Sequence, residues 1–179
     1  MGTQIAVVGG LLLAIATMAY GDEIHVAAEK GELEKVRSLI AANPSLVNVE
    51  GNQNTTPLHW AAARGRKDIA DFLISQKANL EAKDRYGFTP LLTAAQNGQK
   101  ELVELLLRHK ANIEAKEGTG KTSLHWAVVF NHKAVVEVLL LNKADMNSRD
   151  KHNETPLQNA SRLGHKDVAK VLQQYGAKQ

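Results

Sequence analysis

The chain repeats itself with a period of 33 residues. The tetrapeptide TPLH at residues 56–59 returns as TPLL at 89–92, TSLH at 122–125 and TPLQ at 155–158, without insertions. An alanine and a leucine keep the same register, at Ala61 and Leu73 and at each equivalent position of the later copies. Because a fixed period of this length marks stacked supersecondary units, the fold follows from the structure of one unit.

One unit, residues 84–116, predicts a turn followed by two short helices. The turn begins at Asp84 and ends at a glycine that can take a positive φ. Thr89 can cap a helix, and Pro90 suits the first helical position because no backbone hydrogen bond is lost there. Gly98 ends this helix, and a leucine-rich segment with one apolar face follows. Neither helix can bury its apolar face alone, so the units must stack into one continuous core.

Four consecutive units resemble the ankyrin repeat in their TPLH-x-A-A motif, their glycine between helices and their apolar second helix. The resemblance implies an all-α solenoid in which each unit adds a β-turn finger and two antiparallel helices. The expected organisation is a leader at 1–21, a degenerate capping repeat at 22–50, repeats at 51–83, 84–116 and 117–149, and a C-terminal repeat or cap at 150–179.

Several positions depart from the ankyrin pattern. Lys77, Lys110 and Lys143 stand where the family usually has glycine after the second helix. A lysine in the left-handed region costs roughly 1 kcal/mol, so we expect local backbone strain at these sites. Asn131 replaces an inter-helix glycine, and Ser123 replaces the proline that follows the capping threonine.

The first 21 residues contain no charged side chain. Their apolar run, from Ile5 to Tyr20, is shorter than the about 20 residues that span a membrane, and it fits the core of a signal peptide. Ala19 and Gly21 are small residues placed for signal peptidase, with cleavage before Asp22. We therefore expect an extracytoplasmic protein, periplasmic or secreted. An uncleaved membrane anchor and a cytosolic extension are the alternatives.

The chain offers little for chemistry. It has no cysteine, which excludes disulfides, Cys-based metal centres and a Cys nucleophile. The AKEGTGKT stretch from Ala115 to Thr122 resembles a phosphate-binding loop, but Gly120 falls on the turn glycine of the repeat. The histidines form no i, i+4 pair, and zinc needs three or four converging ligands. No strained turn presents a nucleophile, so we expect no enzymatic activity, metal or cofactor.

The resemblance implies a protein-binding module that uses its concave surface of finger tips and first helices. In this chain that surface holds a local apolar cluster with polar neighbours, which is the composition of binding hot spots. The expected partner-binding residues are Arg85, Tyr86, Phe88, Gln96, Asn97, Lys121, Val129 and Phe130. Alternatively, Phe88 and Phe130 pack on each other and only stiffen two fingers. Trp60 and Trp126 are expected to pack between repeats.

Basic residues recur with the same period, although the formal net charge is only +3. The rows are Lys67, Lys100, Lys133 and Lys166; Lys77, Lys110 and Lys143; and Lys83, Lys116 and Arg149. Acidic residues run beside them, which favours a solvated face. The alternative function is a structural or protective protein that binds an anionic surface such as a polysaccharide, a membrane or nucleic acid.

These patterns also limit the expected partners. No aromatic residues interleave with the lysine rows, so we expect no nucleic-acid partner. Membrane contact is expected only if the leader stays uncleaved. The expected state is a monomer that binds an unidentified protein.

Overall fold

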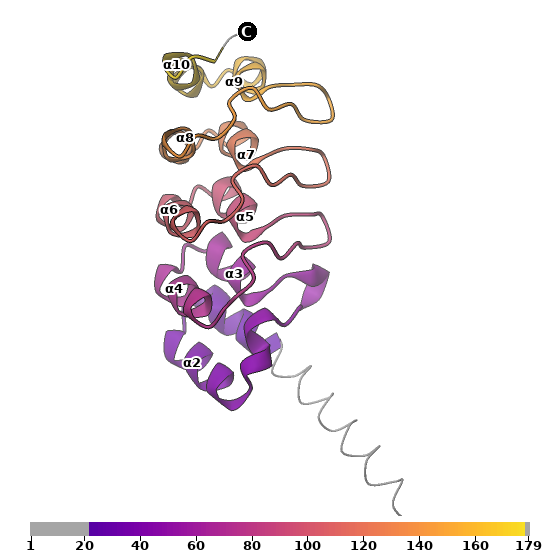
Figure 1. Ribbon diagram of the computed structural model, residues 1–179, viewed down its shortest axis with the longest axis vertical. Coiled ribbons are helices and arrows are strands. Elements are labelled where there is room, and N and C mark those ends of the chain that lie inside the picture. Colours follow the sequence, from indigo (N-terminus) through magenta and orange to yellow (C-terminus); the bar gives the residue numbers. More distant parts are fainter. Residues whose placement is uncertain (1–21, 178–179) are drawn as a thin grey trace, which may run out of the picture.

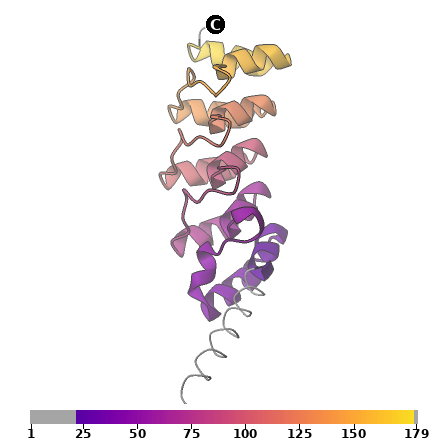
Figure 2. The ribbon, with the colours of Figure 1, turned by 90° about the vertical axis from the view of Figure 1, so that its right-hand side faces the viewer.

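The computed structural model describes residues 22–177, so the predicted leader lies outside the described residues. Within that range the chain is an all-α solenoid without β-strands (Figure 1). The inner helices are α3 (Pro57–Ala63), α5 (Pro90–Gln96), α7 (Ser123–Val129) and α9 (Pro156–Leu163). The outer helices are α4 (Lys67–Ser75), α6 (Lys100–Arg108), α8 (Lys133–Leu141) and α10 (Lys166–Gln174). Figure 2 shows the same stack from the side of the fingers, with the units one above another.

The N-terminal part has the helix–glycine–helix plan expected of a cap. Residues 22–30 are helical, followed by α2 (Leu33–Ala42) and the 3-10 turns η1 (Pro44–Asn48) and η2 (Asn52–Asn54). Apolar side chains of this cap are buried, namely those of Ile24, Ala27, Ala28, Val36, Leu39 and Ile40. The cap therefore closes the core of the first full repeat.

The inner helices are too short to be stable alone, and their ends are fixed by capping. Thr89 accepts a hydrogen bond from the backbone N–H of Leu92 at 3.4 Å, and Pro90 stands at the first helical turn. Gly98, two residues after the last helical residue, has φ 72°. The predicted cap and stop signals of this helix are confirmed.

Backbone strain lies where the sequence predicted it. Lys77, Lys110 and Lys143 have φ angles of 67°, 69° and 65°, and Asn131 has 59°. These residues let the backbone turn sharply after a helix, and the N–H of Lys110 reaches back to the carbonyl of Leu107 at 3.0 Å. The three lysines therefore adopt the left-handed backbone conformation, which glycine adopts at no steric cost.

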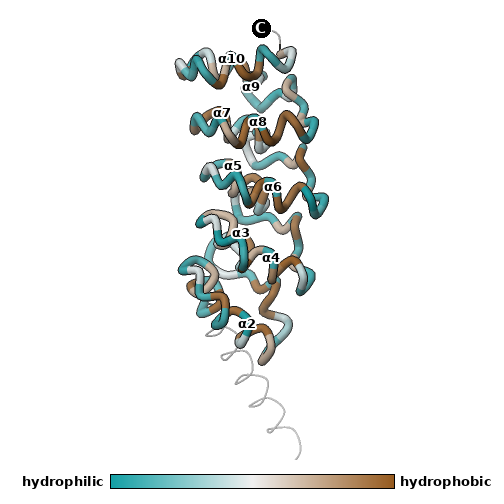
Figure 3. The backbone as a smooth tube through the Cα atoms, turned by 90° about the vertical axis from the view of Figure 1, so that its left-hand side faces the viewer, coloured by the Kyte–Doolittle hydropathy of each residue, from teal (hydrophilic) through white to brown (hydrophobic). Residues whose placement is uncertain are grey.

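The core is formed by the apolar faces of both the inner and the outer helices. The outer helix α6 packs against the inner helix α5, where the small side chain of Ala94 allows close approach. The buried residues of α6 are Leu102, Val103, Leu105 and Leu106. Figure 3 shows hydrophobic and hydrophilic residues alternating along each stacked helix, as expected for helices with one buried face. No helix within residues 22–177 is both long and apolar enough to cross a membrane.

Candidate functional site

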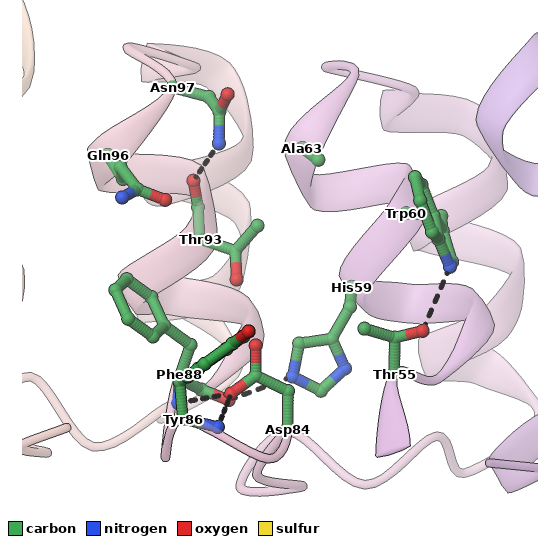
Figure 4. Close-up of a pocket in the computed structure, with 10 residues that line it drawn as sticks. All are labelled: Thr55, His59, Trp60, Ala63, Asp84, Tyr86, Phe88, Thr93, Gln96 and Asn97. Carbon is green, nitrogen blue, oxygen red and sulfur yellow. Dashed lines mark hydrogen bonds between the residues drawn. The ribbon is translucent and has the colours of Figure 1, made fainter. Parts of the chain in front are cut away.

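A groove of about 370 Å³ lies between α3 and α5 and the fingers that precede them (Figure 4). It is lined by Thr55, His59, Trp60, Ala63, Asp84, Tyr86, Phe88, Thr93, Gln96 and Asn97. The structure thus brings together four of the residues expected from the sequence: Tyr86, Phe88, Gln96 and Asn97. The other four lie beside this groove or on the next repeat.

The finger that carries Tyr86 and Phe88 is held by its own backbone. The Oδ1 of Asp84 accepts hydrogen bonds from the N–H groups of Tyr86 at 2.8 Å and Phe88 at 2.9 Å. The N–H of Asp84 in turn donates to the carbonyl of Phe88 at 2.9 Å. Both aromatic side chains therefore project from a closed loop whose geometry is set before any partner arrives.

His59 ties this finger to α3. Its Nδ1 accepts the backbone N–H of Thr56 at 3.1 Å, so its Nε2 carries the proton and donates to the carbonyl of Phe88 at 3.0 Å. Burial lowers the pKa of His59, although the Phe88 carbonyl partly opposes the shift. His59 therefore braces the finger against the first turn of α3.

Three aromatic rings continue from the groove onto the next repeat, and we call Phe88, Trp126 and Phe130 the aromatic strip. The ring centroids of Phe88 and Trp126 are 5.3 Å apart, and those of Trp126 and Phe130 are 5.9 Å apart. Trp126 therefore joins the two phenylalanines, in place of the direct contact considered from the sequence. Phe130 remains 48% exposed and Tyr86, which also lines the groove, 54% exposed.

The polar members of the expected site differ in their availability. Arg85 is exposed, and its guanidinium lies 5.3 Å from the centroid of the Tyr86 ring. The Nδ2 of Asn97 donates to the carbonyl of Thr93 at 2.9 Å. The backbone carbonyl of Gln96 accepts from the Nε2 of His132 at 3.0 Å, and its half-buried side chain is part of the groove lining.

Lys121 and Val129 are held by the adjacent repeat. The Nζ of Lys121 lies 3.0 Å from the Oδ2 of Asp150, and the lysine side chain is only 14% exposed. Val129 is half-buried, and its carbonyl accepts from the Nε2 of His165 at 3.1 Å. Lys121 is therefore a buried link between two fingers rather than a free cation at the rim.

Both tryptophans were expected to pack between repeats, and the structure places them on the concave side as well. Trp60 lines the groove, and its Nε1 donates to the Oγ1 of Thr55 at 3.1 Å. The Nε1 of Trp126 has no partner among the described residues, because Lys121 stands where the first full repeat has Thr55. The signal was present in the sequence, since both tryptophans follow the capping tetrapeptide on an inner helix.

The part of the chain that the structure describes contains no cluster of side chains suited to bind a metal ion. Across residues 22–177 no group of three or more His, Asp or Glu side chains is placed to hold an ion. Gly120, in the stretch that resembles a phosphate-binding loop, has φ 81° and occupies the turn position of Gly87, whose φ is 87°. The repeat therefore accounts for that glycine-rich sequence.

An all-α solenoid with rigid fingers and an open groove defines a class of repeat proteins that bind through an extended surface. The family model described as ankyrin repeats (3 copies) matches residues 24–117, 78–150 and 111–179. The chain belongs to the ankyrin-repeat family. Proteins of this family generally mediate protein–protein interactions and are generally not enzymes.

Individual relatives share only short stretches with this chain. A palmitoyltransferase of Saccharomyces cerevisiae is 36% identical over 61 residues, 33% of this chain and 8% of that protein. An acyl-CoA-binding domain-containing protein of Arabidopsis thaliana is 39% identical over 57 residues, 32% of this chain and 17% of that protein. A serine/threonine-protein kinase of the same plant is 33% identical over 67 residues, 37% of this chain and 14% of that protein. The activities in these names belong to those proteins.

Proposed function

We propose that the protein acts by binding, without chemistry of its own, and that its concave side holds a segment of a partner protein. The binding surface consists of the groove between α3 and α5 together with the aromatic strip. The observation that carries the proposal is the exposure of Tyr86 and Phe130, at 54% and 48%, on a surface of mainly polar residues. Exposed aromatics in a polar setting supply most of the binding energy at protein interfaces.

The rigidity of the fingers supports this proposal. The Asp84 carboxylate closes the groove-lining finger by accepting two backbone N–H groups, and His59 braces it, so little conformational entropy is lost when a partner binds. Gln96 and Arg85 offer donors next to the rings. A partner segment with one large apolar side chain for the groove and polar groups on either side fits this arrangement.

A pull-down with matched variants tests the proposal. The 22–179 chain serves as bait in an extract of its own host, beside Tyr86→Ala and Phe130→Ala. Each substitution should weaken binding of a specific partner by about 2 kcal/mol or more. Leu141→Ala is the control, because Leu141 is 68% exposed at the end of the outer helix α8. Loss of the partner with Leu141→Ala, or equal retention by all variants, would place the interface elsewhere.

We also propose that the protein is exported from the cytosol. The uncharged, apolar first 21 residues support export, with a mature chain that begins at Asp22. Mass analysis of the N-terminus, on protein from the native host, tests this directly. Soluble cytosolic protein that retains Met1 would contradict it.

A further inference from the structure

Three connecting segments join the outer helices to the fingers, at residues 77–83, 110–116 and 143–149, and we call their common surface the connector face (Figure 1). Its cations are Lys77, Lys83, Lys110, Lys116, Lys143 and Arg149, and its carboxylates are Glu81, Glu114 and Asp145. The excess of three positive charges equals the formal net charge of the whole chain, +3. The connector face therefore carries the charge imbalance of the protein.

Each carboxylate of the connector face accepts a hydrogen bond from a backbone N–H group. The Oε1 of Glu81 accepts the N–H of Asn112 at 2.8 Å, and that of Glu114 accepts the N–H of Asp145 at 2.8 Å. The Oδ1 of Asp145 accepts the N–H of Asn147 at 2.9 Å. The bonds of Glu81 and Glu114 join adjacent repeats, whereas that of Asp145 lies within its own connector, and none of the three carboxylates forms an ion pair with a lysine of the described residues.

The cations of the connector face, in contrast, form no ion pairs with other residues of the 22–177 range. In the row at the start of the outer helices, two of the four lysines are paired, since Lys100 lies 3.6 Å from Glu104 and Lys133 lies 3.8 Å from Glu137. Lys116 donates to the carbonyl of Arg149 at 2.9 Å, which keeps both residues on one surface. The ammonium groups of Lys77, Lys110 and Lys143 are exposed and available.

Those three lysines also carry backbone strain. Their φ angles of 67°, 69° and 65° are unfavourable for a side chain with a Cβ. The same chain places an asparagine, Asn131, at φ 59°. Glycine or asparagine would serve stability better at all three positions, and strained residues cluster at functional sites.

We propose that the connector face binds a linear anionic polysaccharide. The strained lysines are one repeat apart, so their backbones are separated by the spacing of packed helices, about 8–10 Å, which is close to one Debye length at 0.1 M salt. A row of unpaired cations along the solenoid matches a chain of carboxylate or sulfate groups, and each contact would release counterions. This surface lies outside the concave groove, so the proposal is independent of the protein partner.

The composition of the connectors argues against two other polyanions, single-stranded nucleic acid and a lipid surface. Residues 77–83, 110–116 and 143–149 contain no aromatic side chain on which bases of a single strand could stack. Their larger apolar side chains, Leu80, Ile113 and Met146, are partly buried and pack against the core. None of these three is free to insert into a lipid bilayer.

Heparin oligosaccharide is the probe for this proposal. The test variant combines Lys77→Asn, Lys110→Asn and Lys143→Asn, which remove three charges and relieve the strained backbone. The control combines Lys67→Gln, Lys100→Gln and Lys133→Gln, which remove three charges at the same spacing. In calorimetric titrations at 0.1 M salt, the test variant should bind at least tenfold more weakly, and the control less than threefold. The slope of log K against log salt should fall by about two to three in the test variant alone.

Three further measurements complete the test. Thermal melting should show the asparagine variant at least as stable as the wild type, so that weaker binding is not a folding defect. Tyr86→Ala should bind heparin as the wild type does, which separates this surface from the concave groove. Equal losses in both triple variants would show that only bulk charge matters and would overturn the proposal. Equal or tighter binding of duplex DNA or phosphatidylglycerol vesicles would overturn the choice of polysaccharide.

Discussion

Lys121 and Asp150 form a buried ion pair between two adjacent fingers. The Nζ and Oδ2 atoms are 3.0 Å apart, and the side chains are 14% and 0% exposed. Within residues 22–177 the Oδ2 atom accepts no hydrogen bond of good geometry, so its contact with the Lys121 ammonium group is an ion pair only. The Oδ1 atom accepts the N–H groups of His152 at 2.8 Å and Glu154 at 3.1 Å. Burial raises the pKa of Asp150, but Lys121 and these N–H groups outweigh it and hold the pKa below its usual value.

Removal of this cation should destabilise the fold. Lys121→Met leaves the Asp150 carboxylate buried without a counter-charge, and we expect a loss of about 3 kcal/mol in unfolding free energy. The loss should shrink in acid, because a protonated Asp150 no longer needs the cation. Urea unfolding measures both effects, with the exposed Lys151→Met as control. A Lys121→Met variant as stable as the control would show that the ion pair contributes nothing net.

Two buried histidines predict a loss of stability in mild acid. Burial lowers the pKa of His59 and of His125 from the ordinary 6.5, and the Nδ1 of each accepts a threonine N–H. Below pH 6.5 the unfolded chain therefore binds protons that the folded chain does not, and unfolding becomes easier. Their stabilising effect is complete above pH 6.5 and disappears as the pH falls toward the lowered values.

The chain itself supplies the control for this prediction. In the last repeat Gln158 fills the histidine position, and its Oε1 accepts the N–H of Thr155 at 2.9 Å. The double variant His59→Gln, His125→Gln should keep the cap and lose part of the pH dependence between pH 7 and 5. The readout is the urea midpoint at each pH. Identical curves for wild type and double variant would assign the acid sensitivity to other groups.

The 33-residue period made the backbone features of each repeat predictable from the sequence, but not the contacts between repeats. Thr89, Gly98 and Lys110 are conformational signals that act within a few residues, so the period placed them correctly in three dimensions. Trp126 and Lys121 were harder, because their contacts come from neighbouring repeats. The position of Lys121 suggested an exposed rim, and only the stacked fingers bring Asp150 within reach. Capping and turn residues, which act within a few positions, therefore predicted the fold. The contacts of side chains on the concave surface depend instead on how far apart neighbouring repeats lie.

Ser123 is a local defect that a single substitution should repair. Its side chain is 0% exposed and its Oγ has no hydrogen-bond partner in the described structure. The preceding Thr122, at φ −88° and ψ 174°, is already in the extended region that proline requires of its neighbour. Ser123→Pro removes the unsatisfied hydroxyl and restricts the unfolded chain, for an expected gain of about 1 kcal/mol.

Ser123→Ala serves as the comparison, since it removes the hydroxyl without restricting the backbone. It should gain less than the proline variant in urea unfolding at an unchanged slope. If Ser123→Pro is less stable than the wild type, the ring does not fit between α7 and its neighbours.

Lys110 offers the clearest measurement of backbone strain. Its φ of 69° brings the Cβ close to its own carbonyl group, and glycine at this position has no such contact. Lys110→Gly should raise the unfolding free energy by about 0.5–1 kcal/mol, less than the full relief because glycine also gives the unfolded chain more freedom. Lys100→Gly is the matched control, because Lys100 begins α6 in the right-handed region and glycine there costs up to about 1 kcal/mol. A denaturant midpoint that falls for Lys110→Gly at unchanged slope would mean that the lysine stem stabilises the fold by more than its strain costs.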